Sequence, residues 1–223
     1  MSKRNQSNAR RTLDSIAGRQ RIPKTKLRVP RMNGASTYVQ SRYVVTTANV
    51  VGTGTQSVNN VLVNPPSYSG TGASNDAGGN VLVNYQEYKM QRGAVTYTPT
   101  VGSTTAGIVY IAYFDNPELI RNINTGAYSV SNTLAIVKNA PTVVSGPVWQ
   151  TIHINMGMRI RRPKYSIDTA GTSSVETTDR CVHGLFCCVV DGVVQTVTTT
   201  YGVLTFEYAA EGFGLQNNNI TTL

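Results

Sequence analysis

The sequence predicts an all-β protein: an eight-stranded antiparallel jelly-roll sandwich with a disordered basic arm at its N-terminus. Segments rich in Val, Thr and Tyr, which suit a pleated and half-buried surface, recur along the chain with Gly and Asn between them. Helix signals are scarce, and strands do not alternate with helices as a parallel sheet would require. About eight such segments joined by long loops favour a sandwich or barrel, and the jelly roll is the eight-stranded solution.

Almost all of the net positive charge lies in residues 1–31. This segment holds ten basic residues and one acid, Asp14, so its charge is 10 − 1 = +9. The whole chain has 20 basic and 11 acidic residues, which also gives +9, so residues 32–223 sum to zero. Pro23, Pro30 and the scattered apolar residues leave no amphipathic pattern that could bury a core.

We therefore expect two parts, an arm of residues 1–37 and a single domain of residues 38–223, which is long enough to form a good core. Each Lys or Arg that neutralises a phosphate releases a counterion, so the arm is expected to bind nucleic acid with salt sensitivity and without sequence preference. A nuclear-import signal, a membrane-surface arm and a mitochondrial transit peptide are alternatives for the same charges. The expected nucleic-acid-binding residues are Lys3, Arg4, Arg10, Arg11, Arg19, Arg21, Lys24, Lys26, Arg28 and Arg31.

Composition also constrains the compartment. The chain starts without an apolar signal region and contains no apolar run of about 18 residues, so neither a signal peptide nor a membrane span is expected. Its cysteines, Cys181, Cys187 and Cys188, are odd in number and crowded together, which argues against a disulfide framework. The sequence therefore indicates a reduced, intracellular and soluble protein.

The first half of the domain is expected to hold four strands and a loop. Alternating and β-branched runs predict strands in residues 38–51, 57–64, 81–99 and 108–114. Between the second and third of these, residues 65–80 are almost all Pro, Gly, Ser and Asn, which predicts an exposed loop.

One short helix and further strands are expected in the second half. In residues 115–123, Asp115 or Asn116 can cap a helix that has Pro117 at its first position. Asp191-Gly192 predicts a tight hairpin turn. Strand chemistry returns in residues 133–139, 146–168, 181–190, 193–200 and 201–210.

The domain contains one basic cluster, RIRRPK, in residues 159–164. In a strand, Arg159 and Arg161 face one side while Arg162 and Lys164 face the other, so the cluster is not one flat patch. Contact with nucleic acid on an inner surface and a solvated edge with ion pairs both remain open.

Catalytic and metal-binding motifs find little support. The two histidines, His153 and His183, accompany no GxSxG, HExxH or phosphate-loop motif, so no enzymatic activity is expected. Cys181 and Cys187 lie about 20 Å apart in an extended strand, too far for one zinc ion, and no CxxC pair exists. Buried strand thiols are the expectation. Trp149 and the tyrosines could stack on bases, although tyrosines at strand positions more often belong to ordinary sandwich packing.

Three stretches carry motifs in a characteristic order. Residues 88–117 contain a strand ending in Tyr-x-Pro, a Thr/Gly turn, a strand with small residues and an Asp-containing corner. Residues 139–149 end in Gly-Pro-x-Trp, and residues 201–212 carry Gly-x-Leu-x-x-x-Tyr. Together they resemble segments of the jelly-roll shell domain in tombusvirus- and sobemovirus-like capsid proteins of small positive-strand RNA viruses. No second, protruding domain follows residue 212, so the layout is more similar to the arm-plus-shell proteins of sobemoviruses and necroviruses.

The resemblance implies a capsid protein that self-assembles into a non-enveloped icosahedral shell and packages genomic nucleic acid, most simply single-stranded RNA, through the basic arm. It implies location in the virion, and in the host cytoplasm during assembly, with no membrane partner. Calcium at subunit interfaces is a further implication, with Asp115 and Glu118 at the corner where such shells place carboxylates, although calcium requires more ligands than these two; no other cofactor is expected. A movement or silencing-suppressor protein that binds nucleic acid, a sugar-binding jelly roll, and the capsid of a small circular single-stranded DNA virus are the alternatives.

Overall fold

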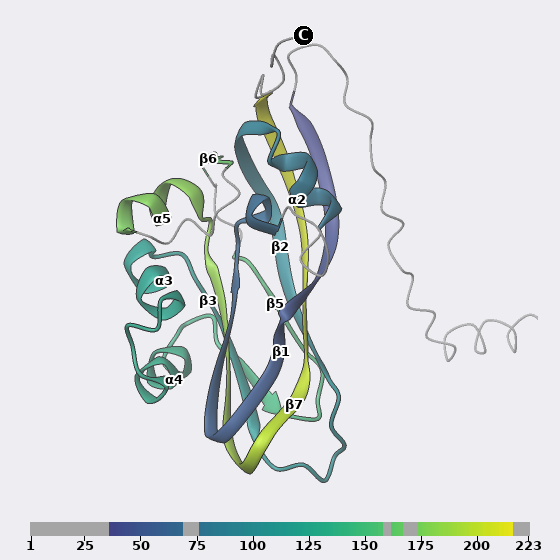
Figure 1. The fold of residues 1–223 in the computed structure, drawn as a ribbon, viewed down its shortest axis with the longest axis vertical. Helices are drawn as coiled ribbons and strands as arrows, with labels where there is room; N and C mark the ends of the chain where they lie inside the picture. The colour runs from purple at the N-terminus through teal and green to yellow at the C-terminus, as the bar shows by residue number, and fades with distance from the viewer. Residues whose placement is uncertain (1–35, 69–75, 158–161, 167–173, 216–223) are drawn as a thin grey trace, which may run out of the picture.

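The computed structural model describes residues 36–68, 76–157, 162–166 and 174–215, with the side chains of 43–55 and 193–198 left out. Two long strands form its framework (Figure 1). Strand β1 (Thr37–Leu62) and strand β7 (Leu185–Leu215) pair antiparallel from end to end, with Thr37 opposite Gly212 and Leu62 opposite Leu185. Shifts of register near the middle of this pair divide each strand into two halves.

Each half of the long pair belongs to a different sheet. In the first sheet, the initial half of β1 and the final half of β7 are joined by β2 (Tyr85–Pro99), β5 (Ile152–Asn155) and the short β6 (Lys164–Tyr165). In the second sheet, the other two halves are joined by β3 (Ile108–Phe114) and β4 (Val144–Pro147). All these pairings are antiparallel, so the predicted all-β jelly-roll sandwich is confirmed, with β1 and β7 each contributing a segment to both sheets.

The main core lies between the two sheets and is rich in aromatic rings. The side chains of Tyr88, Tyr97, Phe186 and Phe206 have almost no exposed surface. The two tyrosine hydroxyls have hydrogen-bond acceptors. Tyr97 donates to the Val148 carbonyl at 2.6 Å, and Tyr88 donates to the Cys181 carbonyl at 2.6 Å. Aromatic rings of this size supply much of the burial that stabilises a sandwich.

A second core lies between the second sheet and three helices, α3 (Pro117–Asn124), α4 (Val130–Lys138) and α5 (Val175–Cys181) (Figure 1). This layer was not expected from the sequence. Apolar side chains of the helices pack on outward residues of β3 and β7. The helices contribute Ile120, Ile123, Leu134 and Val137, and the strands contribute Ala112, Cys187 and Val189.

The short helix predicted in residues 115–123 is confirmed as α3. Asn116 is its N-cap, and its side-chain oxygen accepts from the backbone N–H groups of Glu118 at 2.9 Å and Leu119 at 3.3 Å. Pro117 occupies the first turn, where its missing N–H costs nothing.

Helix α4 corrects the strand predicted in residues 133–139. Ser129 caps this helix by accepting from the Asn132 N–H at 3.2 Å, and Thr133, Leu134 and Val137 form its buried face. That spacing of one and four residues is helical, but the short apolar run Leu-Ala-Ile-Val does not distinguish a buried helix from a strand.

Other boundaries also differ from the expectations. The strand predicted in residues 146–168 is divided among the end of β4, β5 and β6. The predicted exposed loop of residues 65–80 contains a 3-10 turn (Pro65–Tyr68) and the start of helix α2 (Ala77–Leu82), whose Gly78, Gly79 and Leu82 are buried. That helix also takes the first residues of the strand predicted from residue 81, so β2 begins at Tyr85. Likewise Cys181 ends α5, and β7 begins only at Leu185.

The hairpin predicted at Asp191-Gly192 is wrong because β7 continues through it. Gly192 has a φ of 78°, so the glycine is used, but for a bend within one strand. Pairing with the neighbouring strands keeps β7 continuous here, because Asp191 lies opposite both Gln56 of β1 and Ile108 of β3.

Within the described residues, no helix is long and apolar enough to cross a membrane.

Candidate functional site

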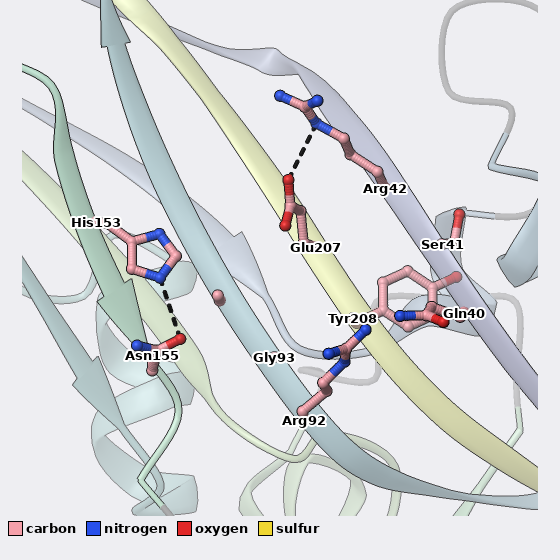
Figure 2. Close-up of a pocket in the computed structure, with 10 residues that line it drawn as sticks. Gln40, Ser41, Arg42, Arg92, Gly93, His153, Asn155, Glu207 and Tyr208 are labelled. Carbon is pink, nitrogen blue, oxygen red and sulfur yellow. Dashed lines mark hydrogen bonds and ion pairs between the residues drawn. The ribbon is translucent and has the colours of Figure 1, made fainter. Parts of the chain in front are cut away.

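A groove of about 320 Å³ crosses the outer face of the first sheet (Figure 2). Strand register explains how residues distant in sequence meet there: Arg42 lies opposite Glu207, Glu207 opposite Ala94, and Ala94 opposite Asn155. These four residues form one row across β1, β7, β2 and β5. The complete lining is Gln40, Ser41, Arg42, Arg92, Gly93, Ala94, His153, Asn155, Glu207 and Tyr208.

The charged residues of the groove are exposed. Arg42 Nε lies 3.1 Å from Glu207 Oε1, and Figure 2 shows the two side chains directed toward each other. Since these side chains are 52% and 39% exposed, the pair stabilises the fold by about 1 kcal/mol at most. Arg92 owes its position to a β-bulge between Met90 and Arg92, which leaves both Gln91 and Arg92 exposed.

Hydrogen bonds on both sides fix the ring of His153. Its Nε2 lies 3.2 Å from Asn155 Oδ1, and its Nδ1 lies 3.0 Å from the Thr96 hydroxyl. Because the Asn155 oxygen can only accept, Nε2 donates to it, and the Thr96 hydroxyl and Nδ1 share the second hydrogen bond.

A buried carboxylate supports the groove from below. Asp76 is only 3% exposed, and it caps α2 by accepting from the Gly79 N–H at 2.8 Å. Its oxygens also accept from Ser41 Oγ at 2.5 Å and from the Tyr208 hydroxyl. Burial, followed by the charge of Asp76, raises the pKa of Tyr208 well above its usual value. This network fastens α2 to β1 and β7.

The residues predicted to bind nucleic acid, in the arm, lie outside the described residues. Of the basic cluster in residues 159–164, Arg162 is exposed and Lys164 lies in β6. Lys164 Nζ is 3.3 Å from Asp179 Oδ1 and also donates to the Asp179 carbonyl. An ion pair within the chain therefore accounts for Lys164, while Arg159 and Arg161 lie outside the described residues.

Asp115 and Glu118 are both exposed beside the first turn of α3, where Asn116 rather than Asp115 provides the cap. No group of three His, Cys, Asp or Glu side chains in the described parts of the chain is placed to hold a metal ion. Calcium between subunits therefore remains a prediction.

The three cysteines are free and buried, as expected, although Cys181 belongs to a helix rather than a strand. Burial raises the pKa of Cys187 to about 12 and that of Cys188 well above its usual value. Both thiols are therefore protonated and unreactive at neutral pH.

Sequence reasoning missed the groove. Arg42, Arg92 and Asn155 carry no motif, and their approach depends on the register of four strands and on one bulge. Only the alternation of polar and apolar residues along β2 and β5 could have indicated that they share a face.

Comparisons with known proteins identify the fold. No family model matches the sequence, and a search of curated proteins found no similar sequence. Among solved structures, a chain of mud crab tombus-like virus matches with a TM-score of 0.67 and 15% identity, covering 85% of this chain and 94% of that one. A chain of tobacco necrosis virus matches with a TM-score of 0.63 and 14% identity, covering 82% and 98%. The capsid protein of Penaeus vannamei nodavirus, in a T=1 subviral particle, matches with a TM-score of 0.57 and 13% identity, covering 85% and 100%.

These structures are viral capsids, and they agree with the resemblance seen in the sequence motifs. The chain therefore has the jelly-roll fold of tombusvirus-like and nodavirus capsid proteins.

Proposed function

We propose that this protein is the capsid subunit of a small non-enveloped icosahedral virus and that it packages a single-stranded RNA genome with its basic arm. One observation carries the proposal: the fold matches viral capsid chains over more than 80% of this chain and more than 90% of theirs.

The distribution of charge supports the proposal. Residues 32–223 have no net charge, so many copies can pack side by side without mutual repulsion. The +9 of residues 1–31 is then available for a polyanion. In a closed shell of about 60 or more copies, several hundred positive charges face one enclosed volume, and counterion release favours the condensation of nucleic acid there.

The burial of reactive groups is consistent with a container. The thiols of Cys187 and Cys188 are enclosed, and their raised pKa keeps them protonated. Such a protein works through its surfaces, and its virion location follows from the shell it forms.

The test is electron microscopy of the purified full-length protein together with its A260/A280 ratio after nuclease treatment. Uniform particles that protect nucleic acid are expected, and digestion of the extracted nucleic acid with ribonuclease but not deoxyribonuclease would identify it as RNA. Resistance to ribonuclease would favour the single-stranded DNA alternative. Small species whose nucleic acid is fully digested, across a range of salt and pH, would overturn the capsid proposal in favour of a nucleic-acid-binding regulator.

A further inference from the structure

The outer faces of the two sheets differ in what they meet. Helices α3, α4 and α5 cover the second sheet and bury a core against it (Figure 1). The outward side chains of the first sheet remain accessible: Arg42, Arg92, His153 and Asn155 are all exposed, and they border a groove (Figure 2). The first sheet thus has an accessible face in the part of the chain that is described.

The charges on this face balance. Its basic side chains are Arg42, Lys89 and Arg92, and its acidic ones are Glu87, Glu207 and Glu211, as the strand register places them. A surface that binds nucleic acid needs an excess of positive charge. A face on which both signs alternate is suited instead to a protein surface that also carries both signs.

Exposed apolar side chains gather at one end of the same face. Tyr38 is 45% exposed and lies opposite Glu211, while Tyr165 is 52% exposed and lies opposite Glu87. Large apolar side chains next to Arg are typical of the residues that contribute most to protein–protein contacts.

The size of the face indicates a weak contact. Four strands about 4.8 Å apart and about eight residues long at about 3.3 Å each cover roughly 500 Å². A standard stable interface buries about 800 Å² on each partner. One such contact would hold two copies only weakly, but a closed shell repeats it in every subunit.

We propose that the outer face of the first sheet is a contact surface for a second copy of this chain. This face, called here the sheet face, comprises the three basic and three acidic side chains named above together with Tyr38, Gln40 and Tyr165. The occupant is a second copy because the face is charge-balanced like the rest of the domain, and because the proposed function, on which this inference rests, requires copies to meet.

The test compares full-length Arg92→Glu with the wild-type protein. Arg92 is exposed on a bulge, so its replacement should leave the fold intact, which circular dichroism and thermal unfolding can verify. Arg180→Glu is the charge control: it makes the same change of charge at an exposed position of α5, in the helix layer that covers the second sheet. Particle yield by electron microscopy and small oligomers by sedimentation velocity are measured for all three proteins.

We expect the yield of Arg92→Glu particles to fall about ten-fold or more while Arg180→Glu assembles like wild type. Hydroxyl-radical footprinting supplies a second readout, in which Tyr38 and Tyr165 are oxidised in dissociated protein but protected in wild-type particles. Normal assembly of Arg92→Glu together with unprotected Tyr38 and Tyr165 would overturn the inference and leave the capsid function intact.

The two proposals can also fail separately. If wild type forms small oligomers but no particles, and Arg92→Glu returns them to monomers, the contact surface stands and the capsid function fails. A wild-type protein that stays monomeric at high concentration refutes both.

Discussion

Lys138, the last residue of α4, donates a hydrogen bond from Nζ to Asp191 Oδ2 at 2.8 Å, at the bend of β7. The same ammonium lies 4.7 Å from the centroid of the Tyr110 ring, within range of a cation–π interaction. Gln56 of β1 also donates to Asp191 at 3.2 Å. One carboxylate therefore joins the helix layer to both long strands.

The fold should become less stable in acid partly because of Asp191. Its bond to Lys138 holds the pKa of the Asp191 carboxyl below its ordinary value. A lowered folded-state pKa stabilises the fold above the unfolded-state pKa of about 3.9, and this stabilisation is lost as the pH falls through the folded-state value. Urea unfolding from pH 6 to pH 2.5 should therefore show a smaller acid loss for Asp191→Asn than for wild type.

The comparison has an internal control. Lys138→Gln removes the other partner of the same bond and leaves the Asp191 carboxyl in place. Its acid loss should likewise be smaller than that of wild type. An Asp191→Asn profile that runs parallel to the wild-type profile would show that the bond to Lys138 contributes no pH dependence.

Gly184→Ala should destabilise the protein by about 1–3 kcal/mol through overpacking. A Cβ at this position would lie 2.2 Å from the Tyr113 hydroxyl oxygen and 2.4 Å from a ring carbon. Tyr113 cannot easily withdraw, because it is buried and its hydroxyl donates to the His183 carbonyl at 2.8 Å. Gly102→Ala is the control, since a Cβ there would meet nothing within 4 Å. Urea midpoints would contradict the prediction if the two variants were equally stable.

The hydrogen bonds of Asp76 should stabilise the fold by more than an ordinary helix cap does. Asp76→Ala removes the cap of α2 and leaves the buried Tyr208 hydroxyl without this acceptor, so a loss of about 2–4 kcal/mol is expected. Ser174→Ala removes the cap of α5, an exposed Oγ that accepts from Thr177 N–H at 3.0 Å, and should cost about 1 kcal/mol.

A double-mutant cycle separates the cap from the network. If Tyr208→Phe is introduced first, Asp76→Ala should lose less stability than it does in wild type, because the stranded hydroxyl is no longer present. Equal losses in the two backgrounds would mean that the Tyr208 hydroxyl contributes nothing to the stabilisation by Asp76.

The fold could be predicted where local chemistry and long-range pairing agree. Residues 108–114 form β3 with the predicted bounds because the run is both apolar and β-branched. At Asp191-Gly192 the two disagree, and the partner strands β1 and β3 override the local turn signal. The groove could not be predicted. Arg42 and Arg92 are 50 residues apart in sequence, and only the register of the strands brings them to the same groove.

Deleting residues 1–31 should abolish the packaging of nucleic acid while leaving the β domain folded. The deletion removes all of the net charge of +9 and leaves every residue of β1 to β7 in place. Because binding through ten basic residues depends on counterion release, wild-type binding to single-stranded RNA should also weaken steeply with salt. Nuclease-protected nucleic acid per particle, measured for wild type and the deletion, tests the first expectation.

A length-matched variant shows whether the length or the charge of the arm matters. Replacing the ten basic residues of the arm by Gln keeps its length, and it should lose packaging as completely as the deletion does. Empty or smaller shells from either variant remain consistent with the arm as the genome-binding segment, since an arm can also influence the curvature of the shell. Full-length nucleic acid encapsidated by the Gln variant would refute that assignment, and the genome would then have to be held by the neutral domain itself.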